Sequence, residues 1–177
     1  MMRWLFASLV LLLSACATPP SPPQELSLRL SPASLGRELA LQQRMTVSAH
    51  GRSQQMDVAI EVDAEAVRMA VMDFGQTVAR LEWDGRTLNE SRAKGWPDSV
   101  TGARVLSDLQ LVHWPLPAIR TALPAGYSIE GDAAARTVRF HDTAMVRVRY
   151  PAPGTAELDN LAAGYQLRLD AWPGSAR

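Results

Sequence analysis

The sequence lacks most features that mark catalytic or nucleic-acid-binding chains. It has a single cysteine, so an intramolecular disulfide is excluded. Its 18 Lys and Arg residues balance its 18 Asp and Glu residues, which argues against a partner with a phosphate backbone. HExxH, GxSxG, P-loop and GxGxxG patterns are all missing. We therefore expect no enzymatic activity, no catalytic residues, no cofactor, no metal site and no nucleic-acid partner, although a Ser, His and Asp brought together only by the fold stays open.

The sequence does carry an export signal at its start. Arg3 supplies a short positive region, and residues 4–13 form an apolar run that is too short to span a hydrocarbon core of about 30 Å. This pattern predicts a signal peptide over residues 1–15 rather than a transmembrane anchor.

The end of that segment resembles the lipobox of bacterial lipoproteins, because Leu13, Ser14 and Ala15 stand directly before Cys16. The resemblance implies that Cys16 becomes the first residue and carries a diacylglycerol and an N-acyl chain. Ala17 follows instead of Asp, which implies the outer membrane, with the domain on the periplasmic face. The alternative is an ordinary signal peptide with an accidental cysteine.

Four prolines lie between residues 19 and 23, where they disfavour helix and sheet and favour extended chain. We interpret residues 16–36 as the lipidated cysteine with a Pro-rich tether, and residues 37–177 as the folded domain.

Within that domain, apolar residues alternate with polar ones from Leu39 onward and predict four or five strands. His50-Gly51 joins the first two, and Asp84-Gly85 predicts a tight type I′ hairpin turn. Between residues 105 and 123, apolar residues recur at helical spacing, and prolines divide this stretch into two short helices. Alternation then returns for about five strands.

The expected fold is mainly β (α+β), an open antiparallel half-barrel of about 9–11 strands with a short helical lid. A sheet curled this far commonly encloses a ligand-sized apolar space. The inward positions of the predicted strands and helices are candidate cavity walls, although plain core is the alternative for each of them. The candidates are Val58, Ile60, Met69, Val71, Leu81, Trp83, Leu109, Leu158, Leu167 and Leu169.

Four segments together resemble the outer-membrane lipoprotein receptor LolB, in the same order along the chain. They are residues 71–77, 114–124, 157–158 and 164–172. The sequence is still more similar to a family of bacterial lipoproteins often encoded with aryl polyene lipid biosynthesis.

The resemblance implies a LolA/LolB-like barrel that receives the acyl chains of a lipoprotein from a LolA-like periplasmic carrier. It also implies a loop tip that enters the membrane, here Phe74 followed by Gly75. An aromatic side chain at such a tip would expose a large apolar area that suits a membrane interface. The alternative is that Phe74 folds back into the core.

The three histidines lie in predicted turns or at a helix end, without the spacing of a metal site. His50, His113 and His141 are therefore expected to have surface or capping roles.

We therefore predict an outer-membrane lipoprotein that holds acyl chains or another hydrophobic ligand, such as an aryl polyene lipid, for transport or localisation. A structural or interaction lipoprotein with a filled core, serving an envelope complex, is the alternative. A third possibility is an enzyme that processes acyl groups.

Overall fold

The computed structural model describes residues 25–172, which form one sheet, two α-helices and a short 3-10 turn, η1 (Pro32–Leu35). The first half of the sheet comprises β1 (Leu39–Ala49), β2 (Arg52–Val62), β3 (Val67–Asp73), β4 (Gln76–Trp83) and β5 (Leu88–Arg92). Helices α1 (Gly102–His113) and α2 (Leu116–Ala122) follow. The second half comprises β6 (Tyr127–Gly131), β7 (Ala135–Phe140), β8 (Thr143–Ala152), β9 (Thr155–Asn160) and β10 (Tyr165–Ala171).

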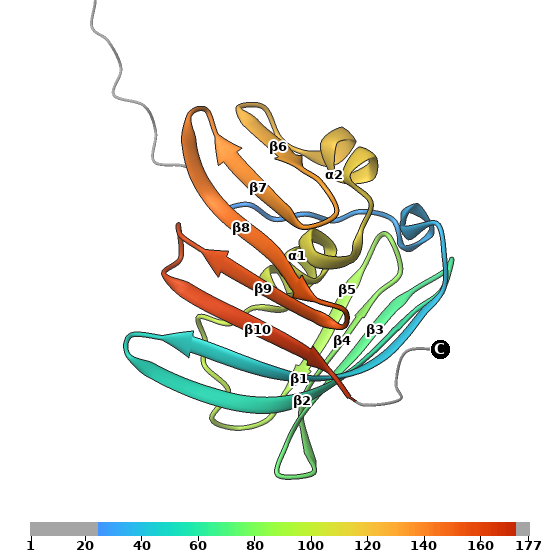
Figure 1. The fold of residues 1–177 in the computed structure, drawn as a ribbon. Coiled ribbons are helices and arrows are strands. Elements are labelled where there is room, and N and C mark those ends of the chain that lie inside the picture. The colour runs from blue at the N-terminus through green and yellow to red at the C-terminus, as the bar shows by residue number, and fades with distance from the viewer. Residues whose placement is uncertain (1–24, 173–177) are drawn as a thin grey trace, which may run out of the picture.

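All ten strands belong to one antiparallel sheet in the order β5-β4-β3-β2-β1-β10-β9-β8-β7-β6. The chain thus builds two meanders that meet where β1 pairs with β10, for example at Met45 and Leu169. Strands β5 and β6 are the two edges, so the sheet is open, and it curls around α1 (Figure 1). The predicted mainly β half-barrel with a helical element is confirmed.

One predicted turn is wrong in detail. The β4–β5 hairpin exists, but Trp83 pairs with Leu88, which leaves a four-residue connection instead of the predicted two-residue type I′ turn. The Asp84 carboxylate accepts hydrogen bonds from the backbone N–H groups of Arg86 (2.7 Å) and Thr87 (2.6 Å). This side-chain capping stabilises the longer turn.

Helix α1 begins after Thr101, whose hydroxyl accepts a hydrogen bond from the Arg104 N–H (3.3 Å) and so caps the helix. Pro117 sits in the first turn of α2, as predicted. No helix within residues 25–172 has the length and apolar character needed to cross a bilayer.

Residues 25–36, which we call the strap, pack beside α1, so the predicted start of the folded domain at residue 37 is wrong. Leu28, Leu30 and Leu35 belong to the buried core. The Leu28 N–H donates to Ser107 Oγ (3.1 Å), and Leu30 exchanges two 3.0 Å hydrogen bonds with the Gln110 side chain. The apolar side chains of this segment need burial, so it forms part of the domain. The proline-rich stretch and Cys16 lie outside the described residues.

Candidate functional site

One end of the sheet gathers the connections that surround the candidate site. Because every strand pairs antiparallel with its neighbours, the connections that follow odd-numbered strands all fall at this end. We call this end the rim. It comprises residues 50–51, 74–75, 93–101, 141–142 and 161–164.

Phe74 is the most exposed apolar side chain of the rim. It forms the β3–β4 turn with Gly75, and both residues have positive φ, 46° and 75°. The hairpin reaches below the rest of the sheet in Figure 1, and the Phe74 side chain is 100% exposed. The backbone conformation of a two-residue hairpin thus directs this ring into solvent, so Phe74 is not part of the core.

A cavity of about 800 Å³ lies between α1 and the concave face of the sheet. Its walls come from β1, β2, β3, β4 and β10 together with α1, and strands β6 to β9 contribute none of the lining residues within the described chain. It extends to the rim, where its lining includes His50 and Lys94, together with Arg52 and Asp73 at the adjacent strand ends. Its volume falls in the range of about 300–1,000 Å³ that is typical of ligand pockets.

Seven of the ten predicted wall residues line this cavity: Val58, Ile60, Met69, Val71, Leu109, Leu167 and Leu169. The other three do not. Trp83 is core, and its indole N–H donates to the Leu30 carbonyl (2.8 Å) of the strap. Leu158 is 1% exposed within the core of the second meander, and Leu81 borders a separate void of only about 20 Å³.

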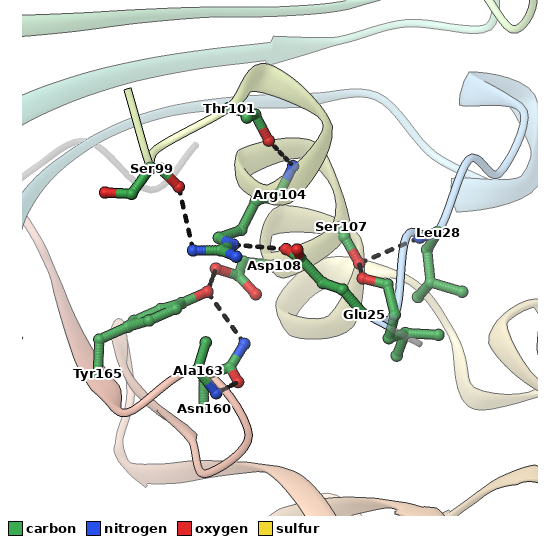
Figure 2. Close-up of polar contacts among 11 residues, drawn as sticks. Glu25, Leu28, Ser99, Thr101, Arg104, Ser107, Asp108, Asn160, Ala163 and Tyr165 are labelled. Carbon is green, nitrogen blue, oxygen red and sulfur yellow. Dashed lines mark hydrogen bonds and ion pairs between the residues drawn. The ribbon is translucent and has the colours of Figure 1, made fainter. Parts of the chain in front are cut away.

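A polar cluster interrupts the apolar wall where α1 faces β10. Tyr165 donates a short hydrogen bond from its hydroxyl to Oδ2 of Asp108 and accepts one from Asn160 Nδ2 (3.1 Å) (Figure 2). Arg104 donates from Nε to Glu25 (2.5 Å) and from Nη1 to the Ser99 carbonyl (3.1 Å). Asp108, Tyr165 and Arg104 all line the cavity.

Burial dominates the electrostatics of this cluster. It raises the pKa of Asp108 to about 7, against the opposing effects of the Tyr165 hydrogen bond and the nearby Arg104 charge. The pKa of Tyr165 is also raised, by burial first and then by the Asp108 charge. Near neutral pH, the Asp108 carboxyl is therefore poised between its neutral and ionised forms, and Tyr165 stays a hydrogen-bond donor.

The cluster was not predicted from the sequence. Asp108 lies three residues after Val105 and four before Val112, so an acidic residue stands within the apolar face of α1. That position was a usable signal. Tyr165 reaches Asp108 across 57 residues of chain, and no local pattern indicates that contact.

Two of the three histidines lie in turns, and the third ends α1. His50 and His141 have positive φ in rim turns. His113 ends α1, but its Nε2 is buried without a hydrogen-bond partner in the described part of the chain, and burial lowers its pKa to about 4. The expected surface role is therefore wrong for this ring nitrogen. Within residues 25–172, no three His, Cys, Asp or Glu side chains gather as a metal site would require.

Fold and cavity together define the class: an open antiparallel half-barrel that wraps a helix and encloses a largely apolar cavity open to one rim. Residues 40–172 match the DUF3261 family, described as a protein of unknown function, and the chain belongs to that family. A comparison with curated proteins finds no match.

Proposed function

We propose that this protein is a LolB-like, non-enzymatic lipoprotein of the outer membrane that binds acyl chains or another hydrophobic ligand for lipid or lipoprotein transport. The observation that carries the proposal is the cavity of about 800 Å³ with walls of Met, Val, Ile and Leu. Such walls favour a hydrocarbon chain, and the flexible thioethers of Met45, Met56 and Met69 adapt to ligands of irregular shape. A LolA-like carrier or an aryl polyene export pathway would supply the ligand.

Three features at one end of the molecule support exchange with a membrane. The cavity reaches the rim, and Phe74 extends from that rim into solvent. Glu25, the first described residue, pairs with Arg104 in the first turn of α1, which follows the rim loop 93–101. Cys16 stands nine residues earlier, so an acyl anchor on Cys16 would hold the rim close to the bilayer.

The anchor is tested by replacing Cys16 with Ala. The variant is expected in the soluble periplasmic fraction, because it lacks the acylated side chain. Retention of the variant in the outer membrane would contradict lipid anchoring at this residue.

Delivery is tested with Phe74→Glu in a chain that begins after Cys16 and retains every described residue. Native mass spectrometry of this chain, purified without detergent, first identifies any bound lipid. Transfer of that lipid to liposomes is then compared between the parent chain and the variant. We expect Phe74→Glu to abolish transfer with little change in the thermal midpoint, because a charged tip does not enter the membrane interface and the ring makes no core contacts.

His141→Glu is the matched control, since His141 also has a positive φ in an exposed turn of the rim. It should keep normal transfer. A parent chain that carries no lipid and takes none up from a lipid extract would instead favour the structural or interaction lipoprotein.

A further inference from the structure

Asp108 is a buried polar group that the protein leaves half bonded. Asp108 is 8% exposed, and its Oδ2 accepts the hydrogen bond from Tyr165. Its Oδ1 has no hydrogen-bond partner within residues 25–172. The residue lies between Val105 and Leu109 on the face of α1 that lines the cavity. A free acceptor thus stands in a wall that is otherwise largely apolar.

Within the described residues, neither Tyr165 nor Arg104 donates a hydrogen bond to Oδ1. Tyr165 uses its only proton for Oδ2 and accepts from Asn160 (3.1 Å). Arg104 lies on the same helix but directs Nε to Glu25 and Nη1 to the Ser99 carbonyl (Figure 2). Because Asp108 lines the cavity, a molecule in the cavity can supply a hydrogen-bond donor to Oδ1.

Asp108 Oδ1 does not belong to the fully buried, unpaired side-chain atoms of the described chain, so it is open to the cavity, where a ligand donor can take the place of solvent. We propose that Asp108 recognises a hydrogen-bond donor on the ligand. The ligand would then be an amphiphile whose hydrocarbon chain lies along the apolar walls. Its hydroxyl or amide N–H would lie next to Asp108 on α1. This inference rests on the proposed function and narrows the class of ligand.

Three probes of equal chain length distinguish recognition of a hydrogen-bond donor from binding of the hydrocarbon chain alone. The donors are 1-dodecanol, with a hydroxyl, and N-dodecylacetamide, with an amide N–H, and methyl dodecanoate offers acceptors only. Each probe displaces the hydrocarbon fluorophore diphenylhexatriene from the chain that begins after Cys16, at pH 8.5. Because the pKa of Asp108 is about 7, its carboxyl is then an acceptor without a proton.

We expect both donors to displace the fluorophore at about tenfold lower concentration than the ester, the effect of one hydrogen bond to a charged acceptor. Asp108→Asn should abolish the advantage of the two donors over the ester, because all three probes carry an oxygen that can accept from its NH2 group. Its amide oxygen would keep the hydrogen bond from Tyr165, which turns its NH2 group toward the ligand. The control is Asp57→Asn, on β2 where the carboxylate pairs with Arg44 and is 43% exposed. It should keep the order of the parent chain.

The outcomes separate this inference from the proposed function. If the three probes displace the fluorophore equally from the parent chain, recognition by Asp108 is overturned and hydrophobic binding stands. If neither fluorophore nor probe binds, the proposed function fails and the inference fails with it. The comparison among probes on the parent chain needs no variant, so it holds even if Asp108→Asn does not fold. A stronger response to the amide would point to acylated protein, and a stronger response to the alcohol to a hydroxylated lipid.

Discussion

Two parts of the sheet use similar apolar sequences for different purposes. The cavity half, β1 to β4 with β10, turns its inward side chains toward an open volume. The packed half, β6 to β9, turns them toward one another and toward the helices, with Val138, Val148 and Leu158 at most 2% exposed. Both halves contribute side chains to the buried core, but only the cavity half also borders a large volume that a ligand can fill.

Truncating one leucine in each half is expected to give the largest contrast. Leu158→Ala should lower the free energy of unfolding by about 3 to 5 kcal/mol, because it opens a void in a filled core. Leu167→Ala should lower it by less than about 1.5 kcal/mol, because Leu167 is only partly buried and already borders the cavity. Urea denaturation of both variants measures the difference, and equal losses would show that both halves are packed alike.

The buried carboxyl of the cavity half should make stability depend on pH. The pKa of Asp108 is about 7 in the folded chain and near its ordinary 3.8 in the unfolded chain. As pH rises from about 4 to 7, the unfolded chain releases this proton first, so the free energy of unfolding falls. Asp108→Asn removes this loss, which amounts to at most about 4 kcal/mol.

The thermal midpoint of Asp108→Asn should therefore exceed that of the parent chain by more at pH 8 than at pH 4.5. Asp57→Asn, on the outer face of the cavity half, should show no such pH-dependent gain. A gain of equal size at both pH values would mean that Asp108 keeps its ordinary pKa in the folded chain.

The smallest expected effect lies at the rim of the cavity half. Phe74 occupies a left-handed conformation with φ of 46°, which costs a residue with a Cβ about 1 kcal/mol or more. Phe74→Gly should therefore raise the free energy of unfolding by about 1 kcal/mol in urea denaturation. A lower stability would instead reveal contacts of the ring that support the fold. A gain would show that the exposed ring is kept at the expense of stability.

The sequence predicted the strands and helices better than it predicted what their inward side chains contact. The alternation of β2 and the helical spacing of Val105, Leu109 and Val112 indicate the right structure because both periods are local properties of the backbone. Trp83 and Leu158 followed the same inward pattern as true wall residues, yet both are core. Periodicity tells which side of a strand faces inward and does not tell whether a void or another side chain lies there.

The sequence by itself determined the local structure: ten strands, two helices separated by prolines, and the turn that presents Phe74, because each depends on neighbouring residues. Only the tertiary structure decided the pairing of β1 with β10, the packing of the strap on α1, and the contact between Tyr165 and Asp108. These contacts join residues far apart in the chain. The cavity itself arises from the curvature of the whole sheet around one helix, which is a property of the assembled elements and not of any single segment.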